Sequence, residues 1–448
     1  MTRHGENVPS RRDFLKVATI SAAALGPFFL FPDRALASQK TLKIAKWAHF
    51  ISGYDSWFEN ELAQEWGKKH DTKVVVDFIP AEQIGERAAA EVRSGKGHDV
   101  FIFPWPPAEY HRHVIDHGEI YQTVAFKYGT IDRLAHRSTF FSKAKKYFAF
   151  CDSWIPLPLH FFEDDWGEVG MPLGPVHYGG LRSGGQRIRE KLGIPCGLAM
   201  TPNLEGNVTL HTLLVAFGGA VLDVHGNVIL NIGARTIEAL KYVKSLYQDA
   251  GASELLAWGS SGNVRAMLER KTSCTSNAIS LLRAAEKQEP RVAGKIRLQP
   301  PLLGSAGSGI LAVPHVTNCS AVWNFAENPE GAKQFLADLI DDSRTGYEKS
   351  QGCNFPIYQK TVPDLIVRLE NDPQGDPPYK YKELKDALYW THNLGVPGYA
   401  TPAFMEVFNT FVIPKMFMSV VRKEASSEDA AAAAAKRVKE IAEKWNQA

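Results

Sequence analysis

The stretch LKIAKW, Leu42–Trp47, opens an alternation of strand and helix patterns that decides the fold. Its apolar and polar residues alternate, which is the period of a half-buried strand. Lys73–Ile79 and Asp99–Phe103 are two further apolar runs of strand length, and apolar residues recur at helical spacing between them. Strands that alternate with helices predict a parallel sheet covered on both faces. Ligands of such sheets bind at the carboxyl ends of the strands, which lie here near Trp47 and Trp105.

Two irregular passages interrupt this alternation. Tyr147–Phe162 is apolar, aromatic and broken by prolines, and Pro300–Pro314 is rich in glycine and proline. We expect both to be extended segments that cross between two lobes. Between them, Gly197–Met200 resembles a buried strand and Leu210–Phe217 a buried helix, so the middle of the chain is expected to build a second α/β lobe.

The N-terminus carries a pattern that resembles a twin-arginine export signal. Two adjacent arginines, Arg11 and Arg12, precede the apolar run Val17–Phe31, and the small residues of Ala35–Ala37 offer a cleavage site. A bilayer-spanning helix needs about 20 apolar residues, so this run is too short to be one. We expect export in the folded state by the twin-arginine translocase and a periplasmic location. The alternative is a basic tail ahead of a buried helix.

The composition is that of an ordinary globular protein. Hydrophobic residues make up 44% and charged residues 22% of the chain, and the formal net charge is +2. This balance favours neither a nucleic acid nor an anionic membrane as a partner. The cysteines are odd in number, far apart and never in a Cys-x-x-Cys pair, which disfavours zinc ribbons and redox motifs. We expect most of them to be buried free thiols; they are Cys151, Cys196, Cys274, Cys319 and Cys353.

Four segments, in this order, resemble the periplasmic solute-binding proteins of ABC importers, the family of the maltose- and other carbohydrate-binding proteins. Ser94–Val100 is similar to that family's entry to its third strand, and Leu213–Asn231 to its helix, Gly-Gly turn and hairpin. Leu268–Ala278 resembles its step from a small loop to a strand, although Arg270 stands where the family usually has glycine. Ala332–Leu336 matches its Ala-x-x-Phe-Leu helix.

The resemblance implies a mixed α/β, two-lobed fold with discontinuous domains joined by a hinge. Each lobe would hold a central, mostly parallel sheet flanked by helices. The expected segments are a signal peptide over 1–37, an N-terminal lobe over 38–152 plus 312–365, and a C-terminal lobe over 157–308 plus 366–448. Solute binding would close the lobes, and a cognate ABC permease would recognise the closed form of a monomeric protein.

The candidate ligand-binding residues are aromatic and polar side chains at the predicted ends of strands and helices. A sugar presents apolar C–H faces and hydroxyl groups, so its site needs aromatic platforms beside amide and carboxylate groups. Each aromatic residue could instead belong to the core, and the polar residues that precede the buried helix could be caps. The candidates are Trp47, Phe50, Tyr54, Trp105, Asn203, Glu205, Asn207, Trp258, Asn277 and Tyr399.

Catalytic and cofactor patterns do not stand out in the sequence. We interpret His111, His113 and His117 as a solvated face rather than metal ligands, and we expect neither a catalytic residue nor a cofactor. The leading hypothesis is therefore capture of a small polar solute, a carbohydrate or polyol. One alternative keeps the fold and binds a polyamine, through carboxylates that converge with aromatics, or a phosphorylated solute. Another is a periplasmic enzyme that is exported folded.

Overall fold

The computed structural model describes residues 40–304, 309 and 311–447. Residues from Lys40 onward pack as one compact unit. The predicted signal peptide, with Arg11 and Arg12, lies outside the described residues.

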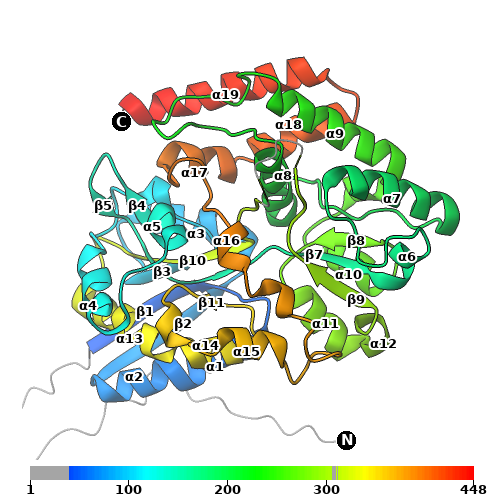
Figure 1. Cartoon of the computed structure of the whole chain (residues 1–448). Coiled ribbons are helices and arrows are strands. Elements are labelled where there is room, and N and C mark those ends of the chain that lie inside the picture. The colour runs from blue at the N-terminus through cyan, green and yellow to red at the C-terminus, as the bar shows by residue number, and fades with distance from the viewer. Residues whose placement is uncertain (1–39, 305–308, 310, 448) are drawn as a thin grey trace, which may run out of the picture. The chain divides into compact units, whose positions relative to one another are not determined.

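A six-stranded mixed sheet forms the core of the first lobe, in the order β11-β6-β10-β3-β1-β2 (Figure 1). β1 pairs in parallel with both β2 and β3, as the alternating pattern predicts. β10 enters between β3 and β6 and is antiparallel to both. The strands of this sheet are β1 (Lys40–Trp47), β2 (Thr72–Ile79), β3 (Val100–Phe103), β6 (Phe150–Ile155), β10 (Val316–Val322) and β11 (Phe355–Pro356).

A three-stranded sheet in the order β8-β7-β9 lies in the second lobe. Both of its pairings are antiparallel, which corrects the expectation of a mostly parallel sheet in this lobe. The reason is its central strand, β7, which enters directly from β6 across 156–158 and runs against both neighbours. Gly197–Met200, expected as a strand, is buried but irregular beside β8. The three strands are β7 (Leu159–Phe162), β8 (Cys274–Ser276) and β9 (Ile296–Gln299), and β4 (Phe140–Phe141) and β5 (Lys146–Tyr147) form a separate hairpin.

Helices surround the two sheets. In the first part of the chain they are α1 (Ser52–Trp57), α2 (Ala63–Lys69), α3 (Ile84–Ser94), α4 (Gly118–Tyr128), α5 (Arg133–Thr139), α6 (Glu163–Gly167), α7 (Tyr178–Leu192), α8 (Leu204–Ala216), α9 (Arg235–Ala250) and α10 (Gly262–Leu268). The rest are α11 (Ser280–Gln288), α12 (Pro290–Ala293), α13 (Pro329–Leu339), α14 (Ser343–Lys349), α15 (Leu365–Glu370), α16 (Ala387–Trp390), α17 (Pro402–Asn409), α18 (Val412–Val421) and α19 (Ser427–Gln447). The short turns are η1 (Phe58–Leu62), η2 (Ala81–Gln83), η3 (Ala108–Tyr110), η4 (Ser253–Ala257), η5 (Ile340–Asp342), η6 (Gln359–Thr361) and η7 (Lys382–Leu384).

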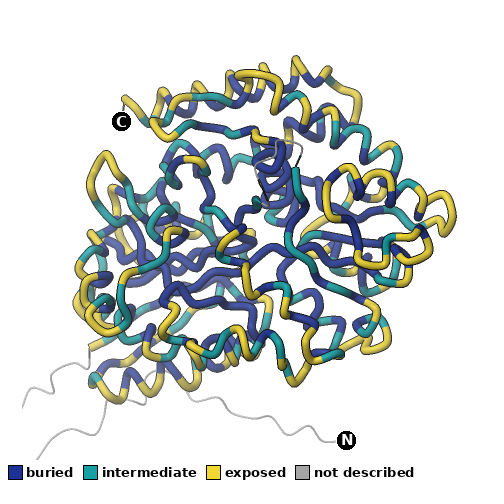
Figure 2. Tube along the Cα trace, viewed as in Figure 1, coloured by how far each residue is buried: buried dark blue, intermediate teal, exposed yellow. Residues whose placement is uncertain are grey.

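Side-chain caps fix the starts of the helices that matter for the site. Asn203 caps α8 by accepting a hydrogen bond from the backbone N–H of Gly206, and Thr401 caps α17 in the same way from Phe404. α8 is buried along its length from Glu205 to Ala216, although it carries several polar residues (Figure 2). A buried helix with polar side chains must find partners for them or face a ligand.

A buried hydrogen-bond chain ties three strands of the six-stranded sheet together. The indole Nε1 of Trp47, at the end of β1, donates to Asn318 Oδ1 of β10 at 2.9 Å. Asn318 Nδ2 donates in turn to Ser153 Oγ of β6 at 2.8 Å. The five cysteines all fall within the described residues, and each is a buried free thiol, as expected.

Within the described residues, no single helix is long and apolar enough to cross a membrane; α17 and α18 meet that test of length and composition only as a pair, bent by 43°.

Replacing Asn318 by alanine should destabilise the protein by about 2 kcal/mol, because the Trp47 indole and the Ser153 hydroxyl both lose a buried partner. Urea unfolding followed by circular dichroism measures the change. Asn60→Ala, which alters an exposed asparagine, is the matched control and should change stability by less than about 0.5 kcal/mol. Equal stability of the two variants would show that the hydrogen-bond chain does not support the sheet.

Candidate functional site

A cavity of about 630 Å³ lies where the two lobes meet, and we call it the Trp105 cavity. One side consists of the segment after β2 and of Trp105 with η3 after β3, so it sits at the carboxyl ends of two parallel strands. The opposite side consists of the start of α8, the junction of α17 and α18, and the end of α19. The cavity therefore has the position that the strand-end rule predicts for a ligand.

Aromatic side chains from both lobes form its walls. The rings of Trp105 and Phe408 both line the cavity and pack against each other, with their centroids 6.3 Å apart and their planes tilted by 55°. Tyr110, Phe411 and Trp445 add further aromatic surface. Such walls suit the C–H faces of a ring-shaped polar solute.

Glu109 of η3 is the central acidic group of the cavity. Asn409 Nδ2 of α17 donates a hydrogen bond to its Oε1 at 2.6 Å, and this bond joins the two lobes. Its Oε2 is buried and has no partner among the described residues. Burial raises the pKa of Glu109 to about 7, and the nearby Glu406 carboxylate adds to that rise.

Helix α8 supplies the amide groups. Asn203 and Asn207 both line the cavity. Asn207 is 1% exposed, and its Nδ2 donates to the carbonyl of Phe408 at 2.9 Å. Its Oδ1 has no partner among the described residues. His211, one turn further along α8, packs its ring against Phe408 at 5.5 Å, and burial lowers its pKa to about 3, so it is neutral.

Glu205 follows the cap of α8 and is 7% exposed. Burial raises the pKa of this carboxyl, and the Glu82 carboxylate across the lobe boundary contributes in the same direction. Its Oε2 has no partner among the described residues. Glu205 does not line the Trp105 cavity, although its neighbours Asn203 and Leu204 do.

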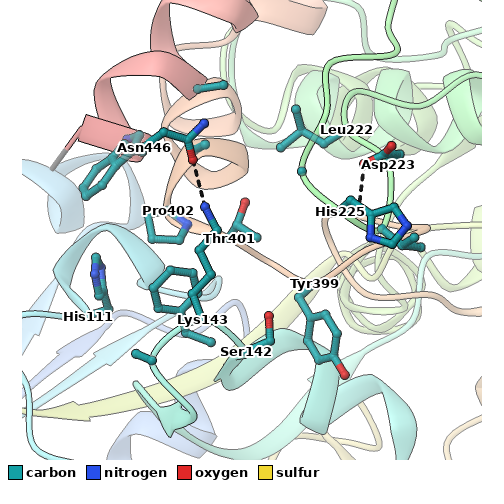
Figure 3. Close-up of a pocket in the computed structure, with 18 of the residues that line it drawn as sticks. His111, Ser142, Lys143, Leu222, Asp223, His225, Tyr399, Thr401, Pro402 and Asn446 are labelled. Atoms are coloured by element: carbon teal, nitrogen blue, oxygen red, sulfur yellow. Dashed lines mark hydrogen bonds between the residues drawn. The ribbon is translucent and has the colours of Figure 1, made fainter.

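A second cavity, of about 600 Å³, contains Tyr399 (Figure 3). It is lined by the β4–β5 hairpin, the turn around Asp223 and the start of α17. Lys143 of the hairpin donates to Asn446 of α19 at 2.8 Å. Trp445 lines both cavities, so the end of α19 stands between them.

The remaining predicted residues lie away from both cavities. Trp47 is fully buried, Tyr54 is 5% exposed, and Phe50 packs edge-on against His315 with centroids 5.4 Å apart. Trp258 is half-buried, and its carbonyl accepts a hydrogen bond from Thr201 Oγ1 at 2.7 Å. Asn277 is buried, with its Nδ2 unpartnered among the described residues. The structure therefore gathers Trp105, Asn203 and Asn207 at one cavity and separates them from the other candidates.

Sequence reasoning missed Glu109, Glu406, Phe408 and Trp445. Glu109 lies two residues after the Trp-Pro-Pro segment that follows β3, and this position near a strand end was the available signal. Glu406 and Phe408 lie in an apolar helical run, and Trp445 lies in an alanine-rich helix. Neither pattern indicates a ligand site.

The histidines of the sequence hypothesis do not form a solvated face. His111 and His117 are buried, and each bonds through its Nδ1 to a backbone carbonyl at 3.0 Å. The Nε2 of His117 also accepts from the N–H of Val322. These bonds arise because the segment folds back onto β10. Within the described parts of the chain, no group of three His, Cys, Asp or Glu side chains is placed to hold a metal ion.

Comparison with solved structures finds the same architecture in transport proteins. A sugar transporter from Arthrobacter chlorophenolicus with bound laminaribiose shares 12% identity over 90% of this chain and 99% of that chain, with a TM-score of 0.75. A maltose-bound protein from T. maritima shares 16% identity over 90% of this chain and 99% of that chain, with a TM-score of 0.71. The chain has the two-lobed fold of these solute-binding proteins.

A third relative by structure is an ABC transporter solute-binding protein from Agrobacterium radiobacter in complex with ribitol. It shares 17% identity over 90% of this chain and 98% of that chain, with a TM-score of 0.68. No family model and no curated protein matches the sequence. The predicted mixed α/β fold class is thereby confirmed, with the antiparallel second sheet as its correction.

Glu109→Gln should change the pH dependence of stability in one direction. Because the folded-state pKa is raised to about 7, folded Glu109 holds a proton between about pH 4.5 and 7 that the unfolded chain releases. Its contribution to stability is present below that window and lost as the pH rises through it. Glutamine does not titrate, so the variant keeps its free energy of unfolding over this range while that of wild type falls. The difference between variant and wild type should therefore rise by on the order of 2 kcal/mol between pH 5 and 8.

Urea unfolding at pH 5, 6.5 and 8 measures this difference. Glu65→Gln, which removes an exposed carboxylate on α2, is the control and should keep a constant offset from wild type. A constant offset for Glu109→Gln as well would contradict the assignment of a buried, protonated Glu109.

Proposed function

We propose that this protein is the solute-binding component of an ABC importer and that it holds a carbohydrate or polyol in the Trp105 cavity. The position of this cavity carries the proposal, because it lies at the carboxyl ends of β2 and β3 where the two lobes meet. Its lining includes the packed rings of Trp105 and Phe408 and hydrogen-bond acceptors without partners among the described residues. The laminaribiose, maltose and ribitol complexes of proteins with this fold support the choice of solute class.

The residues of the cavity have separate roles in this proposal. Trp105 and Phe408 together offer an aromatic surface to an apolar face of the solute. Asn207 and Glu109 accept hydrogen bonds from its hydroxyl or amino groups through the oxygens that lack partners. Asn203 lines the same cavity and caps α8, and Glu205 follows it outside the lining. Trp258, Asn277 and Tyr399 would contact only a larger solute.

Solute capture closes the lobes by a hinge motion about the crossings near 156–158 and 311–315. The lobes keep the proposed boundaries of 38–152 plus 312–365 and 157–308 plus 366–448. A cognate permease recognises the closed monomer in the periplasm, after export by the twin-arginine translocase. We further propose that the protein performs no catalysis, since proteins with this fold are solute carriers.

Trp105→Ala should reduce solute affinity by at least about tenfold, because it removes one of the two aromatic walls. A thermal-shift screen of sugars and polyols first identifies a solute that stabilises the protein, and calorimetric titration then compares the variants. Tyr389→Ala removes an exposed aromatic side chain outside both cavities and should leave the affinity unchanged. Unaltered affinity of Trp105→Ala, or stabilisation by none of the solutes, would refute the proposal.

A further inference from the structure

The Trp105 cavity carries an excess of negative charge. Four carboxylates line it, on Glu82, Glu86, Glu109 and Glu406. Glu82 of η2 and Glu86 in the first turn of α3 are exposed and form no ion pair among the described residues. The basic residue of the lining is Lys444, whose ammonium group already bonds to Glu406 at 2.7 Å. The same Glu406 oxygen also accepts from the Trp445 indole at 2.7 Å, so this acidic group is satisfied within α17 and α19.

An independent observation concerns the buried acceptors. Asn207 lines the cavity and is 1% exposed, and its Nδ2 donates a hydrogen bond to the carbonyl of Phe408. Its remaining polar atom, Oδ1, can only accept, and it has no partner among the described residues. Glu109 Oε2 also has no partner among the described residues, and it accepts when the carboxyl is ionised. A buried acceptor without a partner costs free energy, which an occupant of the cavity would recover by donating hydrogen bonds.

The two observations favour one type of occupant. An ammonium group has three donors and no acceptor, so it matches two unpaired acceptors and the surplus negative charge at once. The aromatic faces of Trp105 and Phe408 also attract a cation. A neutral hydroxyl group can donate one hydrogen bond, but it does not compensate a carboxylate, whereas an ammonium group beside Glu109 favours the ionised form of that carboxyl.

We propose, on the basis of the solute-binding function above, that the Trp105 cavity selects an aminated carbohydrate, with its protonated amine at Glu109 and Asn207 and its ring against the aromatic wall that Trp105 and Phe408 form together. The class is thus a cationic sugar rather than a neutral one. Glu82 and Glu86 at the mouth raise the local concentration of such a solute.

The test compares three disaccharides that share a β-1,4-linked glucose skeleton and differ only at carbon 2. They are cellobiose, with hydroxyls; the disaccharide of glucosamine, with protonated amines; and diacetylchitobiose, with neutral amides. Calorimetric titration at pH 7 should give at least about tenfold tighter binding of the glucosamine disaccharide than of the other two. High salt should weaken this preference, because it screens the charges at the mouth. Glucose, glucosamine, N-acetylglucosamine and spermidine extend the comparison to smaller and ring-free probes.

Variants connect the preference to the residues. Glu109→Gln should lower the affinity for the aminated sugar at least about tenfold more than the affinity for neutral sugars, because glutamine keeps an acceptor oxygen and loses the negative charge. The double variant Glu82→Gln with Glu86→Gln changes only exposed side chains, so it tests the charge without a risk to folding, and should lower the affinity less. Glu65→Gln, on α2, removes the same single negative charge as Glu109→Gln. It is the control and should leave the affinity for each sugar unchanged.

Each other outcome decides a different claim. Neutral sugars that bind as tightly as their aminated counterparts would overturn the preference for an amine and leave the solute-binding function intact. Tighter binding of spermidine than of every sugar would overturn the carbohydrate part. Absence of binding by every amine would overturn the inference, whereas the solute-binding function itself falls only if neutral sugars and polyols also fail to bind.

Discussion

The hydrogen bond from Asn409 to Glu109 joins the two lobes at the point on which the site depends. η3 follows β3 of the six-stranded sheet, and α17 packs against η3 on one side and α19 on the other. This contact places the ring centroids of Trp105 and Phe408 6.3 Å apart, at the wall of the cavity. It also leaves one oxygen of Glu109 buried without a partner, so the lobes meet around an incomplete hydrogen-bond set that a solute can complete.

The C-terminal end of α19 completes the walls. Lys444 and Trp445 both bond to Glu406 of α17, and Lys143 of the β4–β5 hairpin bonds to Asn446. Trp445 therefore stands between the Trp105 cavity and the Tyr399 cavity. The arrangement explains why a long alanine-rich helix ends in a tryptophan: the helix positions that ring against groups from both lobes. The two cavities differ in charge, since Arg112, Lys143 and Lys146 line the second one.

Much of the fold could be predicted because it follows from local periodicity. The parallel strands β1, β2 and β3 match the alternating or apolar runs of the sequence, with small shifts at their ends. The strand-end rule also placed Trp105 correctly beside the cavity. It failed to do so for Trp47, because the indole turns inward to a partner on β10, a strand far along the chain. The local sequence pattern of a strand does not indicate whether a side chain at its end packs into the core or faces a cavity.

The acidic part of the site could not be predicted for the same reason. Glu109 and its partner Asn409 are 300 positions apart, and only the packing of η3 against α17 brings them together. The second sheet shows a related limit: single strands can be recognised from composition, but the direction of β7 depends on the crossing that precedes it.

The most direct measurement is a crystal structure of the protein with the solute that stabilises it most. The account predicts electron density for that solute in the Trp105 cavity, against Trp105 and Phe408, with hydrogen bonds to Glu109 Oε2 and Asn207 Oδ1. Density in the Tyr399 cavity alone, with the Trp105 cavity holding only solvent, would contradict it.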